Sequence, residues 1–314
     1  MQGGSSQRCS QRFASPAAAA PVLRALSLGS METLKERRRT VTSHGAELAV
    51  FEYGPEPRPD RPSLLLVHGY PDDHQVFLPA IRDLAGTHHV IAYDTRNAGA
   101  SAVVGPAGGD FTLETLVDDL FAVLAGVDVA DVHLVGHDWG SIQGWAAVQD
   151  PRAQGRIGRY TSISGPDLRH FSRWVRSRLS RPGSWPQLAG QLLRSWYIAA
   201  FLLPKLPEAA WRLVLTRRYE QAAKRSVGND PVRGLALYRA NFFSAPSWPP
   251  GRRVSVPVQV VVPLRDPFLS PDLVEGLEAW VDDLTVVRVN SGHWWPASRP
   301  AEFAALLRES QVRP

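Results

Sequence analysis

Cysteine is almost absent from this sequence of 314 residues, in which Cys9 carries the only thiol. An internal disulfide and a thiol nucleophile in the folded body are therefore excluded. This cysteine usage suits a reducing compartment, and we expect a cytoplasmic protein. Long apolar runs are also missing, because stretches such as 197–203 are much shorter than the roughly 18 residues that a membrane-spanning helix requires. No transmembrane helix is expected.

Acidic side chains are scarce in two segments. Residues 1–40 hold seven basic and two acidic residues, and residues 169–243 hold fourteen basic and three acidic ones, a net charge of +11. Because no nucleic-acid-binding module accompanies this charge, we expect no nucleic-acid partner. Two interpretations of the second segment stay open. It is a solvated helical surface, or it is a basic, Trp-rich surface that makes peripheral contact with anionic membrane.

The first thirty residues predict no packed structure. They are rich in Ser, Ala, Gln and Gly, and the first acidic residue of the chain is Glu32. Their apolar stretches are too short for a secretory signal, whereas an organellar transit peptide fits the composition better. We favour a disordered or spurious extension over residues 1–38, with Met31 as the only internal methionine.

Short β-rich runs alternate with helical patterns from Val41 onward, which is typical of a mostly parallel sheet flanked by helices. The runs cover 48–53, 63–67, 89–93, 132–135, 160–163, 258–262 and 284–289. Helical patterns at 113–127 and 141–149 supply crossovers. Residues 168–248 contain no such run but many Trp, Leu and Arg residues at helical spacing. We expect an α/β core formed by 39–167 and 249–314, and an all-helical cap at 168–248 over the carboxyl ends of the strands, where open α/β sheets bind ligands.

The run at 132–135 leads through GHDWGS, residues 136–141, into a helical pattern. Strand, tight turn and helix in this order form the context of a nucleophile elbow, in which Gly136 and Gly140 let the strand and helix backbones approach. Asp138 occupies the central position, where the elbow G-x-S-x-G has serine. The alternative is that Asp138 merely caps the following helix, but a cap does not explain the flanking glycines.

A second strand end carries a related signal. The stretch LLLVHGYPDD at 64–73 places His-Gly-Tyr-Pro where such folds supply one amide of an oxyanion hole. We expect the backbone N–H groups of Tyr70 and Trp139 to point at a developing oxyanion. His68 is expected to be structural rather than catalytic and to border the substrate pocket, together with Pro71 and Trp294.

Candidates for an acid and a base follow the last two predicted strands. Asp266 follows the run 258–262 in the motif RDP, and His293 follows the run 284–289 in GHWWP. The resulting order of nucleophile, acid and histidine is the one expected after an elbow. Asp167 is an alternative partner for the histidine, which we rank below Asp266.

A carboxylate nucleophile points to substitution at saturated carbon. Attack by Asp138 on an alkyl carbon gives an ester that water can cleave, whereas attack by serine would give an ether. Aspartate, with an ordinary pKa near ~4, is already ionised at neutral pH. His293, oriented by Asp266, is therefore free to activate water in a second step. Opening of an epoxide and displacement of a halide both fit this chemistry.

The sequence resembles the epoxide hydrolases of the α/β-hydrolase superfamily over about residues 40–310. Four motifs carry this resemblance: HGYP (68–71), GHDWGS (136–141), RDP (265–267) and GHWWP (292–296). The resemblance implies the α/β-hydrolase fold with a helical cap and the opening of a small lipophilic epoxide by water to a vicinal diol, without cofactor or metal. It also implies two cap tyrosines that donate hydrogen bonds to the epoxide oxygen. The segments WYIAAFLLP (196–204) and LYR (237–239) are similar to the family's cap stretches and indicate Tyr197 and Tyr238. Lipid epoxides such as fatty-acid derivatives, and a role in detoxification, are expected.

Two rival functions remain. Haloalkane dehalogenases share the aspartate but usually have Asn after the His-Gly pair, where this chain has Tyr70, and they lack the tyrosine pair. A ligand-binding protein without turnover is the second rival, although all triad and tyrosine positions are filled. The chain also resembles the amino-terminal half of two-domain proteins in which a hydrolase-like domain precedes a short-chain dehydrogenase/reductase. Because the sequence contains no G-x-G-x-x-G dinucleotide loop, we expect no redox activity.

Overall fold

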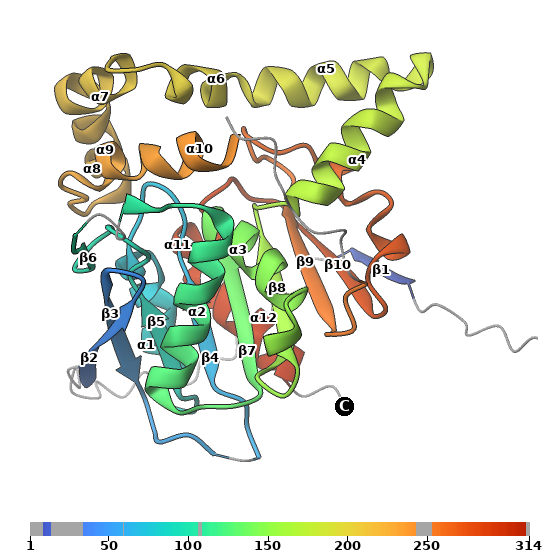
Figure 1. The fold of residues 1–314 in the computed structure, drawn as a ribbon. Coiled ribbons are helices and arrows are strands. Elements are labelled where there is room, and N and C mark those ends of the chain that lie inside the picture. The colour runs from blue at the N-terminus through green and yellow to red at the C-terminus, as the bar shows by residue number, and fades with distance from the viewer. Residues whose placement is uncertain (1–8, 14–33, 59, 106–108, 243–252, 312–314) are drawn as a thin grey trace, which may run out of the picture.

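A ten-stranded sheet lies at the centre of the computed structural model, which describes residues 9–13, 34–58, 60–105, 109–242 and 253–311. The strand order is β1-β10-β9-β8-β7-β4-β5-β3-β2, with β6 paired to β3 (Figure 1). The strands are β1 (Cys9–Phe13), β2 (Glu36–Ser43), β3 (Ala46–Tyr53), β4 (Leu64–Val67), β5 (Val90–Tyr93), β6 (Ala102–Val103), β7 (Val132–His137), β8 (Ile157–Ile163), β9 (Val258–Pro263) and β10 (Leu284–Val289).

The sheet is parallel from β1 through β5 along this order, and only β2, β3 and β6 join it antiparallel. Every β-rich run expected from the sequence is one of these strands. The prediction of a mostly parallel sheet flanked by helices is therefore confirmed.

The expected disordered extension over residues 1–38 is wrong at two places. Cys9–Phe13 pairs in parallel with β10, which would otherwise leave a free strand edge. The strand β2 begins at Glu36 and pairs along the whole of β3. Both strands lie at the edges of the sheet, and β2 is largely exposed and charged, so its sequence carries no apolar alternation. Residues 1–8 and 14–33 lie outside the described residues.

Helices cover both faces of the sheet because each strand sends alternate apolar residues to opposite sides. Leu65 and Val67 pack with α2 and α3 on one face, whereas Leu64 and Leu66 pack with α1 and α12 on the other. Each fully buried side chain of this size contributes about 1.5–3 kcal/mol. The core elements are α1 (Leu78–Leu84), α2 (Leu113–Val127), α3 (Trp139–Val148), α11 (Trp295–Ser298) and α12 (Pro300–Gln311), with short turns η1 (His74–Phe77), η3 (Pro151–Ala153), η6 (Pro271–Val274) and η7 (Leu277–Ala279).

A layer of helices lies between β8 and β9 in the chain and covers the carboxyl ends of the parallel strands (Figure 1). We refer to residues 168–242 as the cap; the remainder of the predicted cap, 243–248, lies outside the described residues. Its elements are α4 (Leu168–Leu179), η4 (Pro182–Ser184), α5 (Trp185–Arg194), α6 (Trp196–Leu202), α7 (Leu206–Ala210), η5 (Trp211–Leu215, a π-helical stretch), α8 (Thr216–Ala223), α9 (Asp230–Arg233) and α10 (Leu235–Phe242). The helices α5 and α6 run end to end across the top, above α10 (Figure 1).

Buried hydrogen bonds attach the cap to the core at several points. The carboxylate of Asp230 accepts from the amide of Gly99 at 2.6 Å. The Asn241 side chain bridges the amide of Leu113 and the carbonyl of Phe111, each at 2.9 Å. Because both cap side chains are more than 90% buried, these bonds fix the cap in one position over the sheet.

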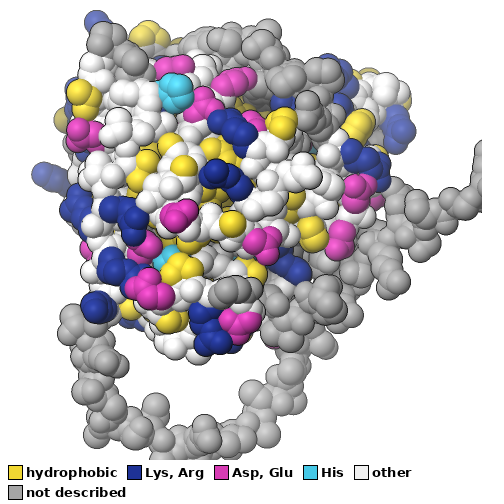
Figure 2. Space-filling view, turned by 60° about the horizontal axis from the view of Figure 1, so that its bottom comes forward, with side chains coloured by type: hydrophobic (Ala, Val, Ile, Leu, Met, Phe, Trp, Pro, Cys, Tyr) yellow, Lys and Arg dark blue, Asp and Glu magenta, His cyan; other side chains and the backbone are white. Residues whose placement is uncertain are grey.

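The surface away from the cap has a mixed charge. The underside of the core carries Arg and Lys side chains interspersed with Asp and Glu (Figure 2). Within the described ranges, no helix is long and apolar enough to cross a bilayer.

Candidate active site

Asp138 stands at the sharp turn between β7 and α3. Its backbone has φ 55° and ψ −120°, and its side chain makes no capping hydrogen bond to α3. A left-handed φ costs a non-glycine residue about 1–3 kcal/mol and persists where the surrounding structure enforces it. Close packing around the turn holds Asp138 in this conformation. A Cβ on Gly140 would overlap the carbonyl of Val67, and one on Gly69 would overlap the Asp138 carboxylate. The geometry is that of a nucleophile elbow rather than a helix cap.

The structure brings Asp138, His293 and Asp266 together from three strand ends. His293 Nε2 lies 3.5 Å from Asp138 Oδ2, and His293 Nδ1 lies 2.9 Å from Asp266 Oδ2. The other Asp266 oxygen accepts from the amide of Phe268 at 2.8 Å, which fixes the carboxylate. His293 therefore lies between two carboxylates, with one ring nitrogen facing each.

Asp167, the alternative partner, has a different environment. One of its oxygens accepts from the amide of Arg169 at 2.8 Å and caps α4, and the other accepts from Gln149 at 3.0 Å. The geometry therefore pairs His293 with Asp266.

The two carboxylates control the charge of His293. Burial alone would lower the pKa of His293, but Asp266 and Asp138 outweigh it and raise the pKa to about 9. Burial likewise favours protonated Asp266, yet the adjacent His293 holds the Asp266 pKa below its ordinary value. At neutral pH the resting site thus holds an imidazolium between two carboxylates. Loss of the charge on Asp138, as in an ester, would lower the pKa of His293 and release a neutral base.

We expect the His293 ring to titrate near pH 9 in the wild type and at lower pH in Asp138→Ala, because the variant lacks one of the two carboxylates that raise its pKa. Nitrogen-15 NMR of the imidazole measures both values. Since the folded-state pKa exceeds the ordinary 6.5, protonation of His293 stabilises the fold fully below about pH 6.5. This contribution disappears as the pH rises through about 9. Equal pKa values in the two proteins would contradict the electrostatic coupling.

One of the two predicted oxyanion donors, the Tyr70 amide, contacts the Asp138 carboxylate, and the other follows Asp138 in the chain. The amide of Tyr70 donates to Asp138 Oδ1 at 2.7 Å. Trp139 is the first residue of α3, where an amide has no acceptor within the helix. The Tyr70 hydroxyl donates to the carbonyl of Pro231 in α9 at 2.8 Å, so the cap also holds this loop in position.

His68 does not border the pocket as expected. It is 1% exposed, its Nδ1 bonds the carbonyl of Gly69, and its Nε2 accepts from the amide of Thr95, each at 2.9 Å. Both ring nitrogens are thus engaged with backbone beneath the loop, and burial lowers the His68 pKa to about 4. The role is structural, because the neutral ring joins two strand-end loops.

Two cavities of about 530 and 480 Å³ meet at the nucleophile. Five side chains line both of them, namely those of Asp138, Tyr197, Tyr238, Phe268 and His293. The larger is extended by apolar residues that include Ile142, Leu168 and Phe242. The smaller is extended by Pro71 and Trp294 and by further aromatic residues. A bound molecule would therefore meet the carboxylate in mostly apolar surroundings.

Both predicted cap tyrosines lie in these shared walls. Tyr197 comes from α6 and Tyr238 from α10, with ring centroids 6.0 Å apart. Burial raises the pKa of both phenols well above 10, and the charge on Asp138 adds to the effect. Both phenols are therefore protonated at neutral pH and can act as hydrogen-bond donors.

Sequence reasoning missed Asp72, which connects the cap to the histidine loop. Its buried carboxylate accepts from Trp294 Nε1 at 2.9 Å, accepts from the Tyr219 hydroxyl, and pairs with Arg225. The motif HGYPDD contained this residue, but its partners are 147 to 222 positions away along the chain. Phe268, which packs edge-on against the His293 ring at 4.9 Å, was also missed.

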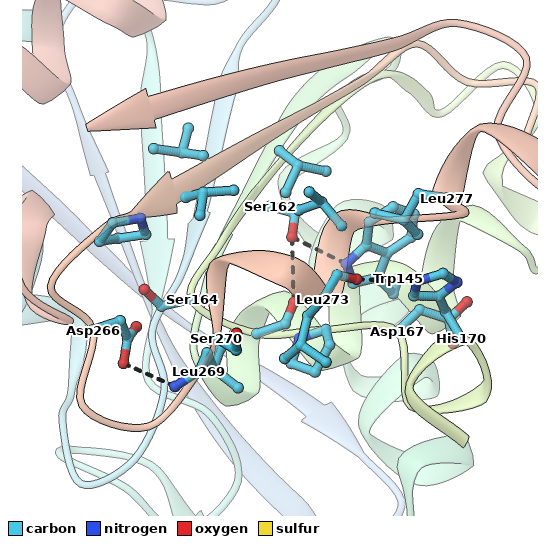
Figure 3. A pocket seen from close by; sticks show the side chains of 17 residues that line it. Trp145, Ser162, Ser164, Asp167, His170, Asp266, Leu269, Ser270, Leu273 and Leu277 are labelled. Carbon is cyan, nitrogen blue, oxygen red and sulfur yellow. Dashed lines mark hydrogen bonds between the residues drawn. The ribbon is translucent and has the colours of Figure 1, made fainter. Parts of the chain in front are cut away.

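A third cavity, of about 480 Å³, lies behind Asp266 (Figure 3). Its polar side chains are engaged with the protein: Ser162 accepts from Trp145 Nε1, and His170 Nε2 bonds the carbonyl of Leu273, each at 3.0 Å. Asp266 lines this cavity and also bonds His293. We assign no ligand to this cavity.

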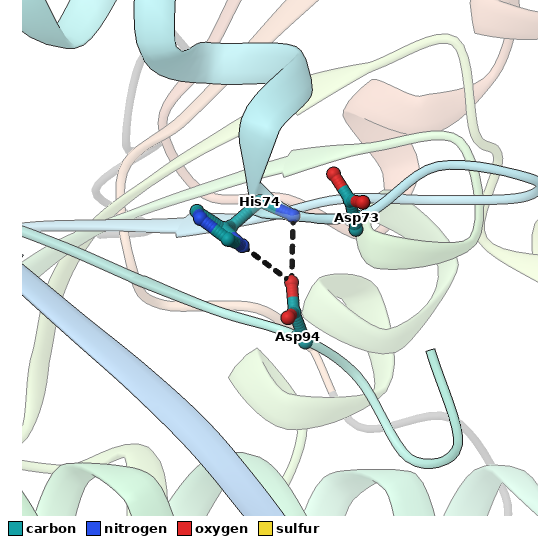
Figure 4. A group of neighbouring side chains, drawn as sticks. All are labelled: Asp73, His74 and Asp94. Carbon is teal, nitrogen blue, oxygen red and sulfur yellow. Dashed lines mark hydrogen bonds and ion pairs between the residues drawn. The ribbon is translucent and has the colours of Figure 1, made fainter. Parts of the chain in front are cut away.

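Asp73, His74 and Asp94 lie close enough together to be considered as metal ligands (Figure 4). Protein donors already occupy their oxygens, however. Asp94 Oδ1 accepts from both the amide and Nδ1 of His74, at 2.8 and 2.7 Å, and its Oδ2 accepts from Ala100. Asp73 pairs with Arg225 at 3.1 Å. We interpret the group as an ion-pair network and assign no metal to it.

The fold and the elbow together define the α/β-hydrolase class of protein. A sequence model described as the alpha/beta hydrolase fold matches residues 62–297. The chain belongs to this family.

Relatives within the family include epoxide hydrolases. The chain is 31% identical over 305 residues to the probable oxidoreductase EphD of Mycobacterium tuberculosis, covering 89% of this chain and 50% of EphD. It is 23% identical over 279 residues to epoxide hydrolase 3 of Xenopus tropicalis, covering 79% and 71%. The chain thus spans about half the length of EphD. These matches confirm the predicted resemblance.

Solved structures agree at the level of the fold. An epoxide hydrolase from Bacillus megaterium superposes with a TM-score of 0.69 at 20% identity, over 86% of this chain and 99% of that one. An epoxide hydrolase from metagenomes of hot environments gives 0.70 at 24%, over 88% and 98%.

Proposed function

We propose that this protein is an epoxide hydrolase that converts a small lipophilic epoxide and water to a vicinal diol. The observation that carries the proposal is the composition of the shared cavity wall. An aspartate at the elbow faces a His-Asp pair, and two protonated tyrosines line the same cavities. Tyrosines matter for an epoxide because its oxygen leaves as an alkoxide and needs a proton, whereas a halide needs none.

In the first step, an Asp138 oxygen attacks a ring carbon and the carbon–oxygen bond of the epoxide breaks. The released alkoxide takes a proton from Tyr197 or Tyr238, and an alkyl ester forms on Asp138. Substitution at saturated carbon needs the ionised carboxylate. The imidazolium of His293 lies 3.5 Å from this carboxylate.

In the second step, His293 acts as a base. Esterification has removed the negative charge from Asp138, so the His293 pKa falls and the imidazolium gives its proton to the tyrosinate. The neutral ring then takes a proton from water. The hydroxide attacks the ester carbonyl, and the amides of Tyr70 and Trp139 stabilise the oxyanion. On collapse, the proton of the attacking hydroxide passes to the departing alkoxide, which leaves as the diol. The Asp138 carboxylate is restored beside the His293 imidazolium, which is the resting state.

The test is a single turnover in oxygen-18 water with the enzyme in excess. The first diol is expected to carry no solvent label, since its new oxygen comes from Asp138, and repeated turnover is expected to label Asp138. Mass spectrometry of the diol and of the Asp138 peptide measures both. Solvent oxygen in the first diol would overturn the covalent route. Halide release from haloalkanes, without diol from a panel of epoxides, would favour the dehalogenase rival.

We also propose that the protein makes peripheral contact with anionic membrane through its basic cap, where lipid epoxides such as fatty-acid derivatives partition. The support is the charge of the cap segment 169–243, at +11, and the lack of any acidic residue from 168 to 207. A role in detoxification fits this substrate class.

A further inference from the structure

Exposed large hydrophobic side chains are concentrated on the cap. Among the described residues, eleven such side chains are exposed, and nine of them lie between residues 179 and 214. They are Leu179, Trp185, Leu192, Leu193, Trp196, Leu203, Leu206, Leu213 and Val214. Single exposed apolar residues are ordinary on a soluble protein, but a concentration of this kind marks an interaction surface.

The outward face of α5 and α6 is apolar throughout. Residues 185, 189, 192, 196 and 199 follow one another at spacings of four and three, which places them on one side of a helix. All are exposed, and they are Trp, Ala, Leu, Trp and Ala. Trp185 is 56% exposed, Leu192 54% and Trp196 69%. A helix on the surface of a soluble protein normally turns polar residues to this side.

The inward face of the same two helices belongs to the active site. Gln191, Tyr197 and Ile198 line the larger of the two cavities that contain Asp138. One pair of helices therefore separates the nucleophile from an exposed apolar surface.

Positive charge accompanies this surface. From residue 168 to 207 the chain holds seven basic residues and no acidic one. Arg176, Arg181 and Lys205 are exposed and form none of the ion pairs found among the described residues.

The acidic residues of the cap are already engaged. Glu208 pairs with Arg239 at 2.6 Å, and Asp230 pairs with Arg233 at 2.8 Å. Glu220 accepts from the amide of Val227 at 2.9 Å. The cap thus presents unneutralised cations, in contrast to the mixed charges of the core underside (Figure 2).

We propose that the outer face of α5 and α6 is the surface that docks on an anionic lipid bilayer. This assignment rests on the proposed membrane contact and gives it a specific location. Trp185 and Trp196 would lie at the headgroup level, with Leu192 and Leu193 in the acyl boundary and the arginines against lipid phosphates. The cavity then lies directly beneath the docked helices, so that a lipophilic epoxide has only the cap to cross.

Charge favours lipid over a second copy of this chain. Two caps placed face to face would bring together two sets of like charges, which opposes association. An anionic bilayer neutralises the same charges.

Co-sedimentation with vesicles tests the docking surface. We expect the wild type to bind vesicles of phosphatidylcholine with phosphatidylglycerol and to bind pure phosphatidylcholine much more weakly. The double variant Trp185→Ser/Trp196→Ser should bind the anionic vesicles about tenfold or more weakly, because it removes the largest apolar area. The matched control is Val104→Ser/Leu264→Ser, whose side chains are 55% and 44% exposed outside the cap; it should bind like the wild type.

Several outcomes would overturn the assignment. These are equal partitioning onto neutral and anionic vesicles, unchanged binding by the tryptophan variant, or equal loss in the control. A dimer in light scattering that the tryptophan variant abolishes, without vesicle binding, would assign the face to a second copy. Thermal unfolding verifies that each variant is folded. Hydrolysis of a water-soluble epoxide by the wild type without vesicles is measured separately, so that failure of the proposed reaction is distinguishable from failure of docking.

Discussion

Replacing Asp138 with alanine is expected to lower epoxide turnover by at least about 10⁴-fold, because no other group can form the covalent ester. Its carboxylate receives the Tyr70 amide at 2.7 Å and faces His293 Nε2 at 3.5 Å. The measurement is the rate of diol formation under single-turnover conditions. Alanine is preferred to asparagine, since an amide at this position could be hydrolysed slowly back to aspartate by the same water-activating histidine.

Asp167→Ala is the matched control for this prediction. Its carboxylate caps α4 and accepts from Gln149, with no contact to His293 among its hydrogen bonds. We expect turnover near that of the wild type and a stability loss of about 1 kcal/mol from the missing cap. If Asp138→Ala kept more than about 1% of the activity, or if Asp167→Ala lost as much as Asp138→Ala, the assignment of the nucleophile and its partners would be wrong.

The central sheet was predictable because its strands are buried on both faces and read as short apolar runs. The predicted helix at 113–127 coincides with α2, in which apolar residues recur at helical spacing and Asp128 ends the helix in a left-handed conformation. The strand β2 was missed for the opposite reason. Its residues ERRRTVTS are mostly exposed at a sheet edge, so only pairing with β3, a tertiary contact, makes them a strand.

The site was predictable where it depends on strand ends. Asp138 directly follows β7, and Asp266 and His293 lie three and four residues past the ends of β9 and β10. The carboxyl ends of parallel strands share one edge of the sheet. Contacts that join distant segments were not predictable. Nothing local distinguishes Asp72, which binds the cap and Trp294, from Asp73 beside it, which pairs with Arg225 and accepts from Gln75.

The cap shows the same limit in its surface. The excess of Arg over acidic residues in the cap was visible in the sequence. Whether the apolar face of α5 and α6 points to the core or to solvent was not. A stripe such as 185, 192 and 196 would ordinarily be predicted to face the core. In the structure Leu188 and Gln191 occupy the inward side instead, because Gln191 bonds the carbonyl of Phe268 at 3.0 Å and the amide of Ser270 at 2.7 Å.

Replacing His293 with glutamine is expected to trap the covalent intermediate. Alkylation of Asp138 requires only its carboxylate and a tyrosine proton, whereas hydrolysis of the ester requires a base. We therefore expect one equivalent of epoxide to be consumed in a burst, followed by turnover about 10²–10⁴-fold slower than in the wild type. Intact-protein mass spectrometry should show an increase equal to the mass of the whole epoxide.

The double variant Asp138→Ala/His293→Gln locates the adduct. If the ester forms on Asp138, this variant should show neither burst nor mass increase. A second control, His170→Gln, replaces a buried histidine that bonds the carbonyl of Leu273 away from the nucleophile, and it should accumulate no adduct. An adduct in the double variant would place the covalent bond on another residue. If His293→Gln shows neither an adduct nor a burst, the histidine is needed before alkylation. The proposal that His293 acts only in the second step would then be wrong.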